Sequence, residues 1–330
     1  MSLMYATVGI HSFKRQVMSS TAVNKNLPTH QAYQTQQAPC SISEALANLR
    51  VGIQNADTNR DERWWLKTGL VDFDEAFQGL RLGAITVLAS RPSMGRSALA
   101  LNIAANMGIF QKRPTLYLSL EMPVWQLTLR IAALLAEVEV STLQEEKLTV
   151  NQDHKLGAAI GKARNAPLHL MHYPYIDMAS LCQQVRAFAQ DHNQQDALSR
   201  LSPLSLLVID DLGYADLQMK MSGGELTAAY ENAMYLLKDL AVELNIAILL
   251  LSTVNPSAEE RENKRPVFTD LPSTALARMS DALLFLYRDE VYSPEGENCD
   301  RAELIMASNS FDVSGTIYLT TNLKYGRFGC

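Results

Sequence analysis

The chain has 330 residues, of which 47% are apolar, and it carries a formal net charge of −6. Its length allows one large domain or two ordinary ones, and its apolar content suffices for a substantial core. The negative charge excludes a wholly basic surface, so any nucleic-acid contact is expected from a local patch.

The four cysteines predict neither a disulfide framework nor a metal site. Cys40, Cys182, Cys299 and Cys330 lie far apart and form no C-x-x-C pair. Reduced thiols of this kind are typical of cytosolic proteins. The sequence contains no apolar run of about 18 residues that would cross a membrane and no secretory signal, so a cytoplasmic protein is expected.

The first 60 residues are expected to form a polar, loosely ordered N-terminal arm. Residues 1–42 are rich in Ser, Thr, Gln, Asn and Ala and show little periodic pattern. A short helix is predicted over residues 41–51, because Ser41 and Glu44 have the spacing of a capping box.

Residues 61–330 are expected to form one α/β domain, with a mostly parallel sheet flanked by helices. Short apolar runs alternate there with longer amphipathic stretches, a pattern typical of such a sheet. The predicted strands are 84–89, 115–120, 168–173, 204–209, 246–252, 282–287, 302–306 and 316–320. The predicted helices are 97–109, 124–137, 178–191 and 225–244. The last two strands indicate an antiparallel hairpin at the edge of the sheet.

An eight-residue turn, Ser90 to Ser97, joins the first strand to its helix and has the form of a phosphate-binding loop. Such a turn directs backbone N–H groups and the positive end of a helix at one point, which suits a polyphosphate. Gly95 allows a close backbone approach, and Ser97 stands where the motif's hydroxyl would bind Mg²⁺. The residues predicted to hold the nucleotide are Ser93, Met94, Gly95, Arg96, Ser97 and Ala98.

Two residues depart from the pattern G-x-x-x-x-G-K-[ST] of this loop. Ser90 replaces the first glycine, and Arg96 replaces the lysine. Arginine keeps the positive charge but presents a planar fork in place of a compact ammonium. Nucleotide binding is expected to survive this change, whereas stabilisation of a transferring phosphoryl group is the weaker expectation.

Two acidic residues complete the candidate catalytic set with Arg96. The apolar strand that ends at Asp210 has the form of a Walker B strand, whose carboxylate would hold Mg²⁺. Glu121 follows the second strand, which is expected to lie beside the phosphate loop, and could orient an attacking water there. Considered alone, Glu121 is equally well explained as an acid at the start of a helix near Pro123.

Several longer strings carry a family resemblance, and those at residues 91–95, 119–123 and 287–292 are more specific than generic nucleotide-binding patterns. They include Arg91-Pro-Ser-Met-Gly95, Ser119-Leu-Glu-Met-Pro123, Leu237-Lys-Asp-Leu-Ala-Val-Glu-Leu-Asn245, Lys264-Arg-Pro266 and Tyr287-Arg-Asp-Glu-Val-Tyr292. In their order and spacing, over about residues 64–328, they resemble the C-terminal ATPase domain of DnaB-type replicative helicases.

The resemblance implies a RecA-like P-loop fold in a hexameric ring. Such a ring hydrolyses ATP with Mg²⁺ and moves on single-stranded DNA to part the duplex. On the matching positions, Glu121 corresponds to the catalytic glutamate and Asp210 to the Walker B aspartate. The family's helical N-terminal domain has no match, although the helix at 41–51 could replace the linker helix that docks on a neighbouring subunit.

Five positions depart from the family's pattern at the site. Arg96 replaces the lysine, Asp211 replaces a tyrosine after the Walker B aspartate, and Thr253 replaces a glutamine that senses nucleotide or DNA. Ser308 and Ser310 stand where the family has a lysine and an arginine that reach the neighbour's γ-phosphate. Loss of an arginine finger costs about 10³–10⁵ in rate in other phosphoryl-transfer systems.

Contact with single-stranded DNA has little support among the basic residues. The predicted helix 178–191 contains only Arg186, and the loop after Asp210 offers only Lys220. Main-chain N–H groups of residues 215–224 could still bind a phosphate backbone.

Two functions therefore stay open. One is an ATP-driven DNA helicase that acts as a ring. The other is a catalytically impaired paralogue that binds nucleotide and acts through assembly, with a replicative helicase or its loader as partner. A recombinase or clock-type ATPase would share the fold but not the strings above. The substituted residues favour slow or absent ATP hydrolysis.

Overall fold

The computed structural model describes residues 41–43, 46, 64–195, 204–214, 223–293, 299–309 and 313–329. Most of the predicted arm, including most of the predicted helix at 41–51, lies outside these residues. The chain divides into two units, Met1–Asp57 and Thr58–Cys330, and all the elements that follow belong to the second.

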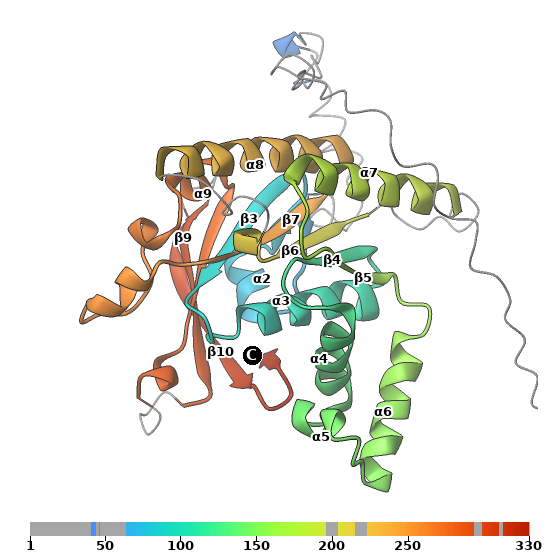
Figure 1. Ribbon diagram of the computed structural model, residues 1–330. Coiled ribbons are helices and arrows are strands. Elements are labelled where there is room, and N and C mark those ends of the chain that lie inside the picture. The colour runs from blue at the N-terminus through green and yellow to red at the C-terminus, as the bar shows by residue number, and fades with distance from the viewer. Residues whose placement is uncertain are drawn as a thin grey trace, which may run out of the picture. The chain divides into compact units, whose positions relative to one another are not determined.

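A nine-stranded sheet is the centre of the second unit (Figure 1). Its strands, in chain order, are β3 Ala84–Ser90, β4 Thr115–Ser119, β5 Leu168–His172, β6 Leu206–Asp210, β7 Ala247–Thr253, β8 Ala282–Tyr287, β9 Arg301–Asn309, β10 Gly315–Asn322 and β11 Arg327–Gly329. The order across the sheet is β11-β10-β9-β8-β3-β7-β6-β4-β5. Strands β1 (Trp65–Leu66) and β2 (Leu80–Arg81) form a separate antiparallel pair.

The parallel sheet and its antiparallel extension confirm the predicted strand pattern. Strands β8, β3, β7, β6, β4 and β5 run parallel, whereas β9, β10 and β11 continue the sheet antiparallel. Strands β7 and β6 lie between β4 and β3, yet the segment after β4 reaches the pocket around the phosphate loop. The edge strand β11 was not predicted.

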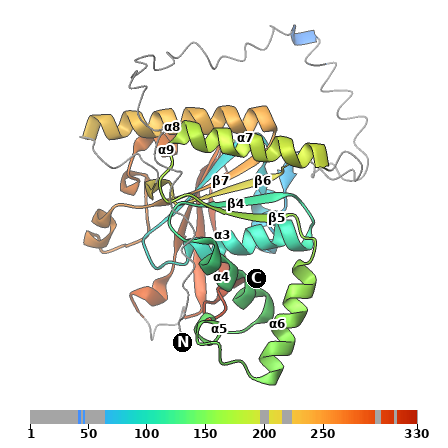
Figure 2. The same cartoon turned by 45° about the vertical axis from the view of Figure 1, so that its right-hand side comes forward.

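Helices cover both faces of the sheet (Figures 1 and 2). They are α2 Val71–Phe77, α3 Arg96–Ala105 with a π-helical turn Asn106–Phe110, α4 Val124–Ala136, α5 Val140–Gln144, α6 Val150–Ala163, α7 Met178–Gln195, α8 Gly223–Leu244 and α9 Thr274–Met279. The four predicted helices are confirmed. Helix α6 was missed, although its start carries a capping box between Thr149 and Gln152.

None of the described helices combines the length and the apolar character that crossing a membrane requires.

Alternating side chains of the central strands supply two separate cores. In β3, Ile85 and Val87 belong to the core that includes α7 and α8, whereas Leu88 belongs to the core that includes α2 and α3. This alternation follows from the two-residue period of a strand. Because both faces are covered, β3 is buried along its whole length and holds the following loop against a rigid base.

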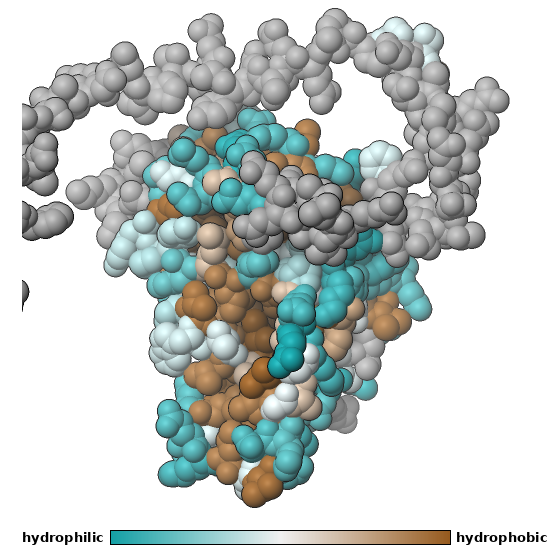
Figure 3. Space-filling view, turned by 90° about the vertical axis from the view of Figure 1, so that its right-hand side faces the viewer, coloured by the Kyte–Doolittle hydropathy of each residue, from teal (hydrophilic) through white to brown (hydrophobic). Residues whose placement is uncertain are grey.

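Several large apolar side chains of α4 and α6 are exposed. Val124 and Trp125 at the start of α4, and Val150 and Ile160 on α6, are exposed. Figure 3 shows the face that includes these helices, with apolar residues concentrated on it. Apolar patches of this kind on a folded domain commonly mark an interaction surface.

The C-terminal strand β11 is fastened to α3 by the buried side chain of Asn102. Its amide nitrogen donates to the carbonyl oxygens of Ala98 at 2.7 Å and Gly326 at 2.6 Å. Its amide oxygen accepts a hydrogen bond from the backbone nitrogen of Phe328 at 3.1 Å. One side chain thus connects the helix after the phosphate loop to the last strand.

We expect the substitution Asn102→Ala to lower the free energy of unfolding by about 2–3 kcal/mol, because it leaves buried backbone groups of Gly326 and Phe328 without partners. Urea denaturation monitored by circular dichroism measures the change. The matched control is Asn151→Ala on the exposed surface of α6, which should change stability by less than about 0.5 kcal/mol. Equal effects of the two substitutions would contradict the anchoring role.

Candidate nucleotide-binding site

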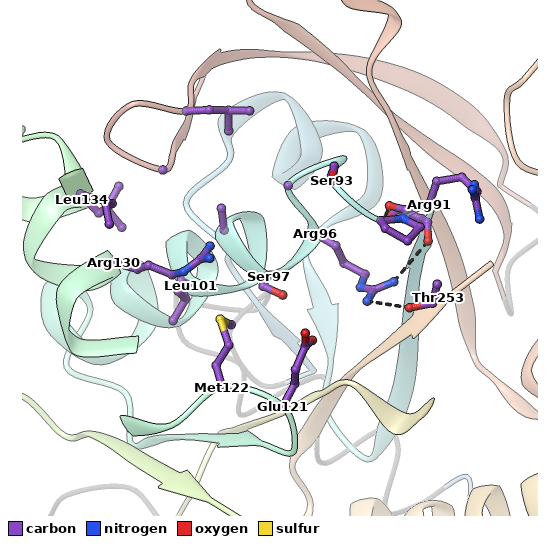
Figure 4. Close-up of a pocket in the computed structure, with 17 residues that line it drawn as sticks. Arg91, Ser93, Arg96, Ser97, Leu101, Glu121, Met122, Arg130, Leu134 and Thr253 are labelled. Atoms are coloured by element: carbon purple, nitrogen blue, oxygen red, sulfur yellow. Dashed lines mark hydrogen bonds between the residues drawn. The ribbon is translucent and has the colours of Figure 1, made fainter. Parts of the chain in front are cut away.

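A pocket of about 490 Å³ opens at the C-terminal ends of the parallel strands, around the predicted phosphate loop (Figure 4). Ligands of open α/β sheets bind at this edge. Residues from the loop, from the segment after β4, from α4 and from the turn before β11 line the pocket. They are Ser90, Arg91, Pro92, Ser93, Gly95, Arg96, Ser97, Ala98, Leu101, Glu121, Met122, Arg130, Leu134, Val140, Thr253, Leu323 and Gly326.

The phosphate loop turns sharply through two residues with left-handed backbone angles. Ser93 and Gly95 have positive φ angles of 66° and 89°, which turn the chain sharply into α3. A Cβ atom on Gly95 would lie 2.9 Å from the Phe328 ring, so only glycine fits there. The buried guanidinium of Arg288 donates to the Ser93 carbonyl at 3.2 Å, which fixes the loop from behind.

The first turn of α3 lines the pocket and offers hydrogen-bond donors to it. The first N–H groups of any helix have no acceptor inside the helix, and the helix dipole makes this end positive. Of the residues predicted to hold nucleotide, the side chains of Ser93, Arg96 and Ser97 lie at the pocket. Met94 differs, because its side chain is buried in the core and leaves only its backbone for binding.

Asp210 lies at the end of β6, fully buried beneath the phosphate loop. Its Oδ1 accepts a hydrogen bond from the Ser97 hydroxyl at 3.1 Å, and its Oδ2 accepts one from the Tyr117 hydroxyl at 2.6 Å. Burial raises the pKa of the Asp210 carboxyl, against the lowering effects of the Tyr117 hydrogen bond and the Arg96 charge. Burial and the neighbouring Asp210 likewise raise the pKa of Tyr117 well above its usual value.

The Ser97 and Asp210 oxygens form the kind of donor set that Mg²⁺ uses. Mg²⁺ prefers hard oxygen ligands and is usually held by one or two carboxylates together with substrate phosphates. The sequence marked both residues but missed Tyr117, which no motif identifies and which orients Asp210 from the neighbouring strand β4.

The guanidinium of Arg96 is turned toward the ends of β6 and β7 (Figure 4). One terminal nitrogen donates to the carbonyl oxygens of Ser90, at 3.2 Å, and Ser252. The other donates to the hydroxyl of Thr253, at 3.0 Å, and to the carboxylate of Asp211. Arg96 therefore lies in the phosphate loop at the pocket, but its terminal nitrogens donate hydrogen bonds to acceptors of the protein.

Glu121 extends into the pocket from the segment after β4, with its carboxylate directed toward Ser97 (Figure 4). The turn that carries it is fixed by the Ser119 hydroxyl, which accepts a hydrogen bond from the Met122 backbone nitrogen at 2.8 Å. Its side chain is exposed, so a water molecule can reach it. The arrangement permits general-base chemistry beside the phosphate loop.

The opposite end of the pocket is apolar and was not predicted. Leu101 of α3, Leu134 of α4, Val140 of α5 and Leu323 of the turn after β10 line it, beside the exposed Arg130. Only Leu101 follows the phosphate-loop motif on α3, and the other three come from segments without a nucleotide-binding motif. The three-dimensional arrangement brings the four residues together. An apolar wall next to a phosphate loop suits the flat face of a base.

The remaining predicted residues do not meet at this pocket. Ser308 lies on β9 opposite Leu283 and is not among the lining residues, and Ser310 lies outside the described residues. The candidate DNA contact Arg186 forms an ion pair with Glu243 at 2.8 Å. Lys220 also lies outside the described residues.

A family model described as DnaB-like helicase C terminal domain matches residues 66–329. The replicative DNA helicase DnaB of Buchnera aphidicola subsp. Baizongia pistaciae is 30% identical over 307 residues, which cover 91% of this chain and 63% of that protein. The corresponding helicase of Geobacillus stearothermophilus is 30% identical over 272 residues, covering 82% and 58%. The chain thus spans about three fifths of the length of these curated relatives.

Two solved structures share the fold. One, described as an ATPase domain, has a TM-score of 0.78 and 25% sequence identity, and covers 88% of this chain and 99% of that chain. The other, a DnaB-like replicative helicase described with its interactions with primase, has a TM-score of 0.76 and 24% identity, covering 88% and 68%. The predicted family resemblance and RecA-like fold are confirmed.

We expect Asp210→Asn to stabilise the protein at neutral pH, because a carboxyl whose pKa is raised on folding costs stability once it ionises. Below the unfolded-state pKa both states are protonated and the cost is absent. The cost grows as the pH rises above that pKa, and it is fully present once the pH has passed the raised folded-state pKa.

Urea denaturation at pH 8 and again below about pH 4 measures this difference. The stabilisation should be present at pH 8 and should shrink at the acidic pH. The exposed Asp191→Asn on α7 serves as the control and should show no such dependence. A loss of stability at pH 8 in the Asp210→Asn variant would contradict the prediction that the ionised Asp210 carboxylate destabilises the fold.

Proposed function

Since the chain belongs to the family of DnaB-like helicase C-terminal domains, we propose that its pocket binds ATP with Mg²⁺ and drives DNA unwinding within a ring. The observation that carries this proposal is a hydrogen bond between the phosphate loop and a buried carboxylate. The Ser97 hydroxyl donates it to Asp210 Oδ1 at 3.1 Å. Nucleotide use is a property of the family, whereas the identity of the nucleotide and metal belongs to the proposal.

The triphosphate would lie along the first turn of α3, with its charge facing the N–H groups from Gly95 to Ala98. The base would lie against the apolar wall of Leu101, Leu134 and Val140. When bound, Mg²⁺ would neutralise phosphate charge beside Ser97 and Asp210. Tyr117 keeps the Asp210 carboxylate directed at this position.

Glu121 is the proposed general base of the site. Its exposed carboxylate faces the phosphate loop, and the Ser119 hydroxyl fixes the turn that carries it. From this position it would orient a water molecule and accept its proton at one carboxylate oxygen as the water attacks the γ-phosphorus. The bond from the γ-phosphorus to the bridging oxygen would break, with ADP as the leaving group.

We propose homo-oligomers, with a hexamer as the family's form, and single-stranded DNA as the ligand of the ring. The exposed apolar side chains on α4 and α6 support an assembly surface (Figure 3). The relative described with primase makes a primase-type partner a further candidate for this chain.

A second candidate function is a catalytically impaired paralogue that binds nucleotide and regulates assembly with a replicative helicase or its loader. The observation that favours it is that Arg96 donates hydrogen bonds to four acceptors of the protein. These bonds compete with a phosphoryl group for the Arg96 donors. Ser308 also favours this second candidate, because the resemblance implies a lysine at its position and a serine lacks the positive charge.

We expect the isolated protein to bind a fluorescent ATP analogue in the presence of Mg²⁺ and to hydrolyse ATP far more slowly than about 10 s⁻¹, even with single-stranded DNA. Steady-state phosphate release and fluorescence titration with and without EDTA measure the two properties. The variant Glu121→Gln should remove the residual turnover and change the nucleotide affinity by less than about twofold.

The first of the following outcomes separates the two candidates, and the other two test nucleotide binding and the role of Glu121. Turnover near about 10 s⁻¹ would reject the impaired paralogue. Failure of the wild-type protein to bind nucleotide at all would reject both functions. Residual turnover that survives Glu121→Gln would reject the role of this glutamate.

A further inference from the structure

Three residues that depart from the family's pattern in separate parts of the sequence contact one another in the structure. Arg96 begins α3, Asp211 follows β6, and Thr253 ends β7. Arg96 donates to both Asp211 and Thr253, and Thr253 donates to the Asp211 Oδ2 atom at 2.6 Å. The three substitutions therefore form a single closed cluster of hydrogen bonds.

The donors of Arg96 are almost all used within this cluster and its surroundings. A guanidinium has five N–H donors, four of them on its terminal nitrogens. These two nitrogens contact four protein acceptors, two backbone carbonyls, a hydroxyl and a carboxylate. The Nε atom is buried, with no partner among the described residues. Bidentate hydrogen bonding to a phosphate thus requires Arg96 to break at least one of these hydrogen bonds.

Asp211 makes that release costly. Its side chain is fully buried. Its Oδ1 atom accepts from the backbone nitrogen of Gly213 at 2.8 Å, and its Oδ2 atom accepts from Thr253 and Arg96. Arg96 is the cationic partner of this carboxylate. A buried charge that loses its partner is strongly destabilising, so Asp211 holds Arg96 at the end of the sheet.

We propose that Asp211 is a positioning residue that restrains Arg96 and thereby sets how strongly the pocket prefers a nucleoside triphosphate over a diphosphate. This inference rests on the proposed function, that the pocket binds a nucleotide. Without the neutralising carboxylate, Arg96 would add its full charge to the phosphate loop. The effect grows with the negative charge of the ligand, so a triphosphate gains most.

The same contacts make residues 96 and 211 interdependent. A lysine at position 96 has a compact ammonium with three donors and lacks the planar fork that serves four acceptors here. Arg96→Lys alone would leave Asp211 poorly compensated. Restoring the family's lysine is therefore expected to fail unless Asp211 is changed with it.

The first test measures the affinities of the full chain for ATP and ADP with Mg²⁺, comparing wild type with Asp211→Asn. Asparagine keeps the shape of the side chain and removes its charge. We expect the ATP affinity to rise at least tenfold and the ADP affinity to rise less, so that the ratio of the two changes. A change of the ratio by less than twofold overturns the proposal.

The matched control is Asp270→Asn. Asp270 is also buried and bound by both terminal nitrogens of an arginine, Arg261, but neither residue lines the pocket. It should leave the ratio of ATP to ADP affinity unchanged. An equal change of the ratio in this control would attribute the effect to general loss of a buried pair and overturn the proposal.

A second test needs no nucleotide and therefore separates this inference from the proposed function. The folding equilibrium constants of wild type, Arg96→Lys, Asp211→Asn and the double variant form a double-mutant cycle. We expect Arg96→Lys to lower the folding equilibrium constant in both backgrounds by different factors. The factor should be at least fivefold larger when Asp211 is present than when it is replaced by asparagine. Additive effects would overturn the restraint of Arg96 by Asp211 even if nucleotide binds. Coupling without nucleotide binding would support this restraint, but it would reject the proposed function and, with it, the triphosphate preference.

Discussion

The central constraint on this domain is the burial of carboxylates under a loop that must attract phosphate. Asp210 and Asp211 are both fully buried at the end of β6, directly beside the phosphate loop. Ionised carboxylates in such a place need hydrogen-bond donors and cations around them. The hydroxyls of Ser97 and Tyr117 serve the first carboxylate, and Arg96 serves the second. The geometry of the site follows from this compensation.

The parallel sheet makes the compensation possible. The C-terminal ends of β3, β6 and β7 lie side by side, so residues distant in the sequence reach one another there. Helix α3 adds its positive end at the same edge. The pocket consequently has a polar end, where charges are balanced against each other, and an apolar end that lies between α4, α5 and the turn before β11.

The parts of the molecule that depend on local patterns were predictable from the sequence. Buried strands, amphipathic helices and the loop from Ser90 to Ser97 have short-range signatures, and the placement of Glu121 and Asp210 at strand ends followed from them. Strand order has no such signature, so the sequence did not predict that β7 and β6 lie between β3 and β4. The link between Arg96 and Asp211 was missed for the same reason, because it depends on which strands are neighbours.

The contact between Gly95 and Phe328 has a consequence for how the protein folds. The phosphate loop lies early in the chain, yet the residues that close over it belong to the last strand. Contacts of such long sequence separation form late and slow the folding of a domain. During synthesis, the phosphate loop would lack this cover until β11 has been made and has joined the sheet.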